Sequence, residues 1–140
     1  MHFEIEYWGP KKSGGIEIYA YESKENKFKV NDTDCWYYKI QYNIVNDVCL
    51  LYSLVNWKRR HPNNIKKFTV KALSFLVYYL RERGYGSIEY FELAPLGGLE
   101  NLNLVRYYES IGFNVYDDKN MRCLFSHFIP EPIKFKHNRE

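Results

Sequence analysis

The segment 101–113, Asn-Leu-Asn-Leu-Val-Arg-Tyr-Tyr-Glu-Ser-Ile-Gly-Phe, decides more about the fold than any other stretch of the chain. Leu104, Tyr108 and Ile111 lie at i, i+4 and i+7, the spacing that places apolar side chains on one face of a helix. The glycine that follows is a helix-stop residue, and the phenylalanine after it is expected to begin a strand. The segment therefore predicts a short helix packed against a core and followed at once by a strand.

Length and composition predict a single globular domain that spans residues 1–140. Hydrophobic residues make up 46% of the chain and aromatic residues 19%, so the core should be rich in rings. The net charge of +3 is well below that of a dedicated nucleic-acid-binding protein. The three cysteines, Cys35, Cys49 and Cys123, are odd in number and have apolar or aromatic neighbours. This pattern favours free thiols and neither a disulfide framework nor a metal site.

Cysteine usage and the N-terminus predict where the protein resides. Free thiols indicate a reducing compartment. The chain opens with the alternating residues Phe3, Ile5 and Tyr7 in place of a charged and then apolar leader, and no apolar run reaches the length of a membrane span. We therefore expect a cytoplasmic protein without membrane attachment. The bias toward Lys, Asn, Tyr and Ile suits an AT-rich genome and suggests a viral or mobile-element source.

Most of the first half of the chain has the pattern of β-strands. Alternating or continuous apolar residues predict strands at residues 2–8, 16–20, 36–44 and 48–57. The Asn46-Asp47 pair between the last two strands predicts a hairpin turn. The charged, Asn-rich stretch 22–33 indicates a loop or an exposed edge strand.

The second half predicts a long helix before the segment quoted above. An apolar stripe from Ile65 to Leu80 has helical spacing, Asn63-Asn64 is expected to cap its start, and Gly84 is expected to stop it. Further strands are predicted at residues 87–94 and 121–129. The polar segment 130–140 is expected to be a mobile tail.

The segment 101–113 resembles the closing motif of the Gcn5-related N-acetyltransferase (GNAT) superfamily. The resemblance rests on an Asn seven residues before Tyr108 and on Tyr-Glu-Ser-Ile-Gly-Phe, and with the order of predicted elements it covers about the last two thirds of the chain. It implies an α+β fold, with a mostly antiparallel central sheet flanked by helices. Residues 9–34 show no clear amphipathic helix, so the N-terminal helical region of the family is expected to be reduced here.

The resemblance implies acetyl-CoA as cofactor and places its binding residues on this chain. The backbone of Leu54, Val55 and Asn56 would bind the pantetheine arm, and Asn101 would hydrogen-bond the same arm, although an Asn at this position is equally a plain helix cap. The family's glycine-containing pyrophosphate loop falls on residues 63–69, which contain no glycine. Charge near the start of the long helix would have to replace that loop, supplied by Arg59, Arg60, Asn64, Lys66 and Lys67.

The catalytic residues that the resemblance implies are Tyr108 as general acid and, as the best available base, Glu92. Tyr108 would protonate the leaving thiolate, although a Tyr on the apolar face of a helix is also an ordinary core residue. Glu92 lies near the exit of the predicted strand 87–94, with Glu89 on the opposite face and His61 as a third candidate. Each of these carboxylates is otherwise a surface charge.

The function predicted from the sequence is transfer of acetyl from acetyl-CoA to a primary amine, on a small molecule or a protein, by direct attack. The alternative is a catalytically inactive GNAT-like module that binds a protein or nucleic acid through its basic loop and aromatic surface. A single-stranded nucleic-acid binder is a third hypothesis, not favoured over the first two. The sequence leaves three alternatives for the acceptor pocket. The pocket is reduced, it is completed by a second subunit of a homodimer, or it is reshaped by the aromatic residues Tyr19, Tyr21, Trp36 and Tyr37.

Overall fold

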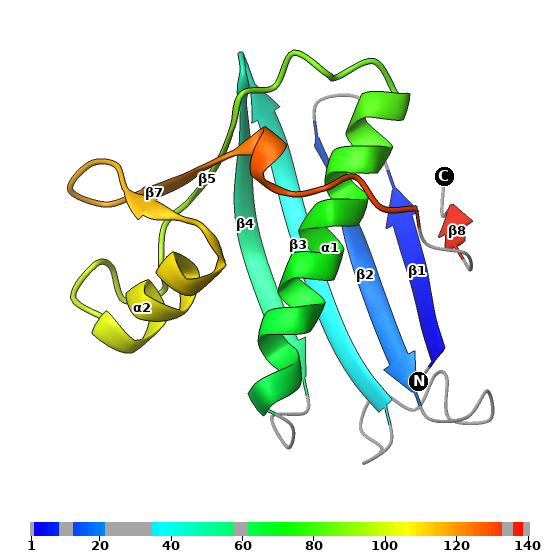
Figure 1. Cartoon of the computed structure of the whole chain (residues 1–140), viewed down its shortest axis with the longest axis horizontal. Coiled ribbons are helices and arrows are strands. Elements are labelled where there is room, and N and C mark those ends of the chain that lie inside the picture. Colours follow the sequence, from blue (N-terminus) through cyan, green and yellow to red (C-terminus); the bar gives the residue numbers. More distant parts are fainter. Residues whose placement is uncertain (1, 9–12, 22–34, 58–61, 133–135, 139–140) are drawn as a thin grey trace.

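In the part of the chain that the structure describes, one eight-stranded sheet packs with two α-helices (Figure 1). The computed structural model describes residues 2–8, 13–21, 35–57, 62–132 and 136–138. In chain order the elements are β1 (His2–Trp8), β2 (Ser13–Tyr21), β3 (Cys35–Val45), β4 (Val48–Trp57), α1 (Pro62–Glu82), β5 (Tyr90–Leu93), α2 (Leu102–Ile111), β6 (Asn114–Val115), β7 (Met121–Leu124) and β8 (Lys136–Asn138). The strands lie in the order β6-β7-β5-β4-β3-β2-β1-β8. The predicted mixed, mainly antiparallel α+β architecture is confirmed.

Among the strands that the structure describes, only two pairs are parallel, β4 with β5 and β1 with β8. The antiparallel hairpin of β3 and β4 forms as the sequence predicts, and Asn46 in its turn has a φ of 55°, a left-handed conformation that Asn tolerates. β1 and β2 form a second antiparallel pair. Among the described residues no helix precedes α1, and the predicted loop or edge strand 22–33 lies outside them.

Helix α1 begins earlier than predicted. Its first residue is Pro62, so Asn63 and Asn64 lie inside the helix and do not cap it. Proline suits this position because it has no N–H to leave unpaired and its φ is already helical. The helix ends before Gly84, which has a φ of 89°. In Figure 1 α1 runs across the sheet in front of β3, and it contacts β2 and β3.

The predicted end of helix α2 is confirmed, and its buried face differs slightly from the predicted apolar face. The Asn101 side chain caps its start, and Gly112, with a φ of 119°, ends it. The buried residues are Val105, Tyr108 and Ile111, whereas Leu104 is only partly buried. The buried residue in the first turn of α2 is therefore Val105, where the sequence predicted Leu104.

The later strands are shorter than predicted. β5 covers only Tyr90–Leu93 of the expected strand 87–94, and β7 ends at Leu124, where a 3-10 turn at Phe125–His127 begins. The polar segment after Pro130, which the sequence assigned to a mobile tail, contributes β8, paired in parallel with β1.

A chain of aromatic rings connects β5, the segment after β7 and α2 in the core. Phe91 lies 5.0 Å from Phe125 and 5.8 Å from Phe128 between ring centroids, Phe113 lies 6.4 Å from Phe128, and Tyr108 lies 5.9 Å from Phe113. Such pairs contribute about 0.5–1.5 kcal/mol each beyond the area they bury. These rings hold α2 to the sheet and therefore fix the position of the motif quoted first.

Cys49 and Cys123 are buried members of this core, whereas the side chain of Cys35 lies outside what the structure describes. Cys49 and Cys123 are free, and burial raises the pKa of both thiols, that of Cys123 to about 11. Within the part of the chain that the structure describes, no group of three or more His, Cys, Asp or Glu side chains is placed to hold a metal ion. None of the described helices combines the length and apolar character needed to cross a membrane.

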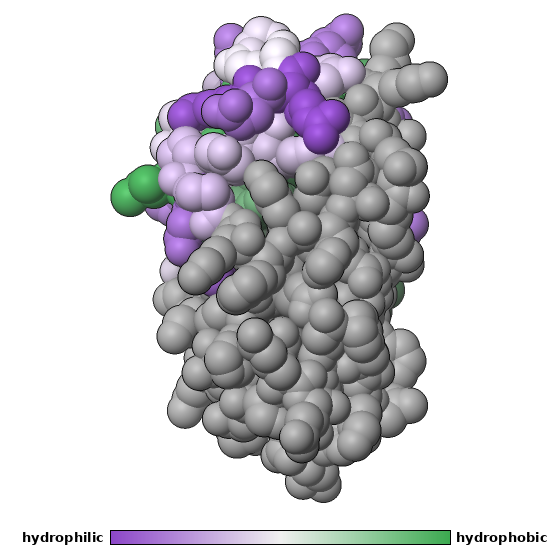
Figure 2. All heavy atoms as spheres, turned by 90° about the vertical axis from the view of Figure 1, so that its right-hand side faces the viewer, coloured by the Kyte–Doolittle hydropathy of each residue, from purple (hydrophilic) through white to green (hydrophobic). Residues whose placement is uncertain are grey.

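Hydrophilic residues gather at the end of the molecule where α1 finishes. Figure 2, viewed from the right-hand side of Figure 1, shows them at its upper end. The exposed residues in this region of the chain include Arg81, Glu82 and Arg83, and the Arg83 guanidinium lies 4.8 Å from the centre of the Tyr79 ring. The basic residues at the helix end complement the helix dipole.

We predict that Gly112→Ala destabilises the fold by about 2 kcal/mol or more. Positive φ costs a non-glycine residue about 1–2 kcal/mol, and an added Cβ would clash with the His127 ring at Nε2. Urea unfolding measures the loss.

Gly86→Ala is the matched control, because a Cβ there meets no atom within 4 Å. Adding His127→Ala to Gly112→Ala should recover the steric part of the loss and leave the backbone part. Equal stability of the Gly112→Ala and Gly86→Ala variants would show that neither the positive φ nor the His127 contact matters.

Candidate functional site

The central feature of the candidate site is the early end of the pairing between β4 and β5. Val48–Leu51 pairs with Tyr90–Leu93, and β5 stops there. β4 continues to Trp57, so the pairings of the described residues leave the edge of Tyr52–Trp57 without β5. The open edge carries backbone N–H and C=O groups available to an extended ligand.

Local features of both strands explain why the pairing between β4 and β5 ends at this point. Pro95 follows β5 closely, cannot donate to a strand ladder and begins a turn in which the Gly98 N–H donates to its carbonyl at 2.9 Å. On β4 the register against β3 shifts: Lys39 opposes Val55, whereas Gln41 opposes Tyr52. β4 thus holds one more residue than β3 here, a bulge that bends a strand and increases its twist.

The open edge of β4 leads into the start of α1. Leu54, Val55 and Asn56 lie on this edge, and Asn64, Lys66 and Lys67 lie in the first turns of α1. The side chains of these six residues, and the whole of Arg59, Arg60 and His61, lie outside what the structure describes. The first turn of α1 holds no acidic residue, so its free N–H groups and positive dipole are not neutralised from within.

α2 is tied to α1 through Tyr107. The Tyr107 hydroxyl and the Thr69 hydroxyl share a hydrogen bond of 2.5 Å, and Thr69 is buried. In the view of Figure 1, α2 lies on the side of β4 from which β5 has departed. Burial raises the pKa of Tyr107, and the Thr69 hydrogen bond opposes that shift. Tyr107 is thereby committed to a structural contact.

Tyr108 differs from its neighbour in having an uncommitted hydroxyl. Its ring is buried against Phe113 and Tyr107, yet its hydroxyl makes no hydrogen bond within the described part of the chain. Burial, followed by the nearby Tyr107 hydroxyl, raises the pKa of Tyr108 to about 12. The phenol therefore keeps its proton at neutral pH, as a general acid must. The ring is a core residue at the same time.

Asn101 has both ends of its side-chain amide engaged inside the fold. Its Oδ1 accepts from the Leu104 N–H at 3.3 Å, and its Nδ2 donates to the Leu96 carbonyl at 3.0 Å. These bonds cap α2 and hold the turn after β5 against the helix start. The structure thus places Asn101 as a helix cap.

Glu92 lies on the sheet face opposite to α1. Its neighbours Phe91 and Leu93 are buried in the core that includes α1, and successive strand residues point to opposite faces. Glu92 Oε1 lies 2.8 Å from Arg122 Nε, and the Arg122 guanidinium also lies 3.8 Å from the centre of the Tyr116 ring. A base at this position would share its carboxylate with Arg122.

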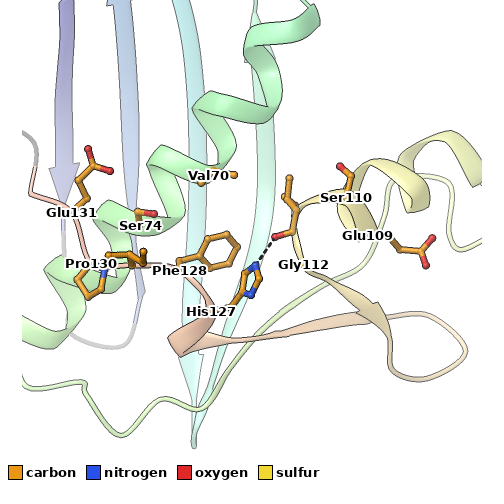
Figure 3. A pocket seen from close by; sticks show the side chains of 11 residues that line it. Val70, Ser74, Glu109, Ser110, Gly112, His127, Phe128, Pro130 and Glu131 are labelled. Carbon is orange, nitrogen blue, oxygen red and sulfur yellow. Dashed lines mark hydrogen bonds between the residues drawn. The ribbon is translucent and has the colours of Figure 1, made fainter.

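A second feature, a cavity of about 760 Å³, was not predicted from the sequence (Figure 3). It lies between α1, the C-terminal end of α2 and the segment 127–131. His127 is held there with its Nε2 3.1 Å from the Ile111 carbonyl oxygen, and because a carbonyl only accepts, Nε2 carries the proton. No sequence signal marks this cavity, since its walls come from three segments that are distant along the chain.

Comparison with known proteins supports the fold. No protein-family model and no curated protein matches the sequence. The structure resembles a mutant of the spermidine N-acetyltransferase SpeG from Vibrio cholerae, with a TM-score of 0.57 and 12% identity over 84% of this chain and 67% of that one. It also resembles Tetrahymena GCN5, with a TM-score of 0.51 and 9% identity over 87% of this chain and 74% of that one. The fold is GNAT-like.

The raised pKa of Tyr108 predicts a loss of stability at high pH. The phenol ionises near pH 10 in the unfolded chain but only near 12 in the folded one, so its contribution is full below pH 10 and falls between these values. Between about pH 9 and about pH 11 the parent should lose about 1 kcal/mol more than Tyr108→Phe, which has no phenol there. Urea unfolding at each pH measures this difference. Parallel pH profiles for the two proteins would contradict the burial-induced shift.

Proposed function

We propose that this GNAT-like chain transfers an acetyl group from acetyl-CoA to a primary amine by direct attack. The observation that carries the proposal is the open edge of β4, which runs into the acid-free start of α1 beside the helix that holds Tyr108. The similar structures include a spermidine N-acetyltransferase, which supports an amine as the acceptor class.

The described residues fit the cofactor in two places. The backbone of Leu54, Val55 and Asn56 can pair with the amide groups of the pantetheine arm as a strand edge pairs with a peptide. The N-terminus of α1 attracts phosphate groups through unpaired N–H groups and its dipole. Lys66 and Lys67, with Asn64, Arg59 and Arg60 nearby in sequence, would add charge where the family has glycines. In this proposal Asn101 supports the site as the cap of α2.

The proposed reaction needs two proton transfers, and one side chain carries out each of them. When bound, acetyl-CoA supplies the acetyl group, the amine nitrogen forms the new bond to its carbonyl carbon, and the C–S bond breaks. Tyr108 would give its phenolic proton to the departing sulfur, since burial keeps the phenol neutral. Glu92 would accept the proton that the amine loses, directly or through water. Its ion pair with Arg122 would weaken when the carboxylate takes up that proton.

A second function, a GNAT-like module that binds without catalysis, is favoured by one observation. Residues 63–69, where the family has its glycine-containing pyrophosphate loop, belong to α1 here and contain no glycine. Backbone that is already helical cannot wrap a pyrophosphate as a glycine loop does. Measurement of cofactor binding and of turnover separates the two functions.

Coenzyme A binding should depend on the charges at the start of α1. We expect the double variant Lys66→Ala, Lys67→Ala to weaken coenzyme A binding about tenfold or more. Its stability should change by less than about 1 kcal/mol, because alanine favours the helix and positive charges at a helix N-terminus do not stabilise it. Calorimetric titration measures the affinity. Lys119→Ala, an exposed lysine in the turn between β6 and β7, is the control. Unchanged affinity in the double variant would remove the phosphate site from α1.

Turnover should depend on the Tyr108 hydroxyl. Tyr108→Phe should lower the acetylation rate about ten- to a thousandfold with nearly unchanged cofactor affinity, because only the proton donor is lost. The rate is measured on a panel of amines with acetyl-CoA.

Tyr107→Phe makes the same chemical change one residue away. It should cost about 1 kcal/mol of stability through the lost Thr69 bond and leave the rate within a few-fold of the parent. Equal rates for Tyr108→Phe and the parent would make Tyr108 a core ring alone. A parent that binds coenzyme A but never turns over would favour the binding module.

A further inference from the structure

Both described helices pack on the same face of the sheet. The buried residues of α1 and α2 belong to one core cluster with strand residues that include Cys49, Leu51, Phe91 and Leu93. Successive residues of a strand point to opposite faces, so the residues between these point away from both helices. Neither described helix therefore covers the face opposite α1, on which Glu92 lies.

An apolar stripe crosses four strands of this face. It consists of residues that oppose one another in the strand register, namely Val45, Val48, Tyr90 and Leu124. Val48 is buried but is not a member of the core cluster, which agrees with its place on the other face. Val45 and Leu124, at the two ends of the stripe, are 44% and 54% exposed. A contiguous apolar surface of this kind marks an interaction site.

A charged pair lies beside the stripe, two residues farther along β5 and β7. Glu92 opposes Arg122 in the register, and its Oε1 accepts from Arg122 Nε at 2.8 Å. Both side chains are partly exposed, and the terminal nitrogens of Arg122 make no hydrogen bond to a described residue. Because the pair has no net charge, two copies of this face do not repel each other through it.

The antiparallel pairing of β5 with β7 makes this surface complementary to itself. A two-fold axis that runs between β5 and β7, parallel to both strands, places β5 of one copy over β7 of the other. Tyr90 then faces Leu124 of the second copy, Glu92 faces Arg122 of the second copy, and each contact occurs twice. Two sheets that pack face to face lie about 10 Å apart, so the facing side chains interdigitate.

We propose that two copies of this chain associate face to face through the apolar stripe and the charged pair beside it. The terminal nitrogens of Arg122 donate to the second carboxylate oxygen of Glu92 in the other copy, and the two stripes exclude water between the sheets. Four strands span only about 14 Å at the usual strand spacing, so the interface is small. We therefore expect a reversible dimer with a dissociation constant in the micromolar range.

This association does not depend on the proposed function. The second copy covers Glu92, so only the monomer presents that carboxylate to an acceptor amine. Failure to detect acetyl transfer would leave the dimer unaffected, and a chain that stays monomeric would leave the proposed function unaffected.

The first test is sedimentation velocity of the full chain, without acetyl-CoA, from about 1 to about 200 µM, a range that brackets the affinity of a small interface. The average sedimentation coefficient should rise from that of a monomer toward that of a dimer. A monomer at every concentration would overturn the proposal. Growth beyond a dimer would also overturn it, because a two-fold contact closes after two copies.

The variant Leu124→Arg locates the surface. It should raise the dissociation constant about tenfold or more, because it buries a charge in the apolar contact with Tyr90 of the second copy. Leu102→Arg, the same change at an exposed residue of α2, should leave dimerisation unchanged. Both leucines are exposed in the monomer, and thermal unfolding shows that each variant is folded. Equal dimerisation of Leu124→Arg and the parent would overturn the assignment.

Charge reversal tests the two-fold arrangement. Glu92→Arg and Arg122→Glu each place like charges opposite one another and should weaken self-association about tenfold or more. An equimolar mixture of the two variants brings opposite charges together at both contacts, so it should dimerise about tenfold more tightly than either variant alone. No recovery in a mixture of folded variants would overturn the arrangement. Leu124→Arg keeps the test of the surface decisive if either charge reversal prevents folding.

Discussion

The parallel pairing of β4 with β5, and its end after Leu51 and Leu93, is the constraint on which the rest of the structure depends. A parallel pair needs a crossover, and α1 supplies it and covers one face of the sheet. Because Pro95 then turns the chain away, β5 does not follow β4 beyond Leu51. The edge of Tyr52–Trp57 is therefore left without β5, and α2 contacts α1 through the hydrogen bond between Tyr107 and Thr69.

Elements with local signals were predicted from the sequence, and elements set by distant contacts were not. The β3–β4 turn at Asn46 and the stop of α2 at Gly112 are local, since each needs a residue that tolerates positive φ. The start of α1 at Pro62 was missed because an Asn pair resembled a cap. β5 was predicted too long, since only its register with β4 and β7 shows where pairing ends.

The candidate site shows the same division. Spacing within one motif selected Tyr108, but the Thr69 bond that occupies Tyr107 and leaves the Tyr108 hydroxyl free depends on a residue 38 positions away. The ion pair of Glu92 with Arg122 likewise joins two strands, so the sequence could name the carboxylate and not its partner. Ser74 lies opposite the apolar stripe that the sequence predicts for α1, yet it is buried and lines the cavity, because segments distant along the chain cover that face of the helix.

The parallel pair of β1 and β8 has a consequence for how the chain reaches its native state. Residues 136–138 pair with the outer edge of β1, which belongs to the first residues of the sequence. During synthesis this edge stays without its partner until residues 136–138 have emerged, and such pairing across a large sequence separation is slow. An uncovered strand edge is a template for association with other chains. Nascent chains are therefore most exposed to self-association through β1 until β8 docks.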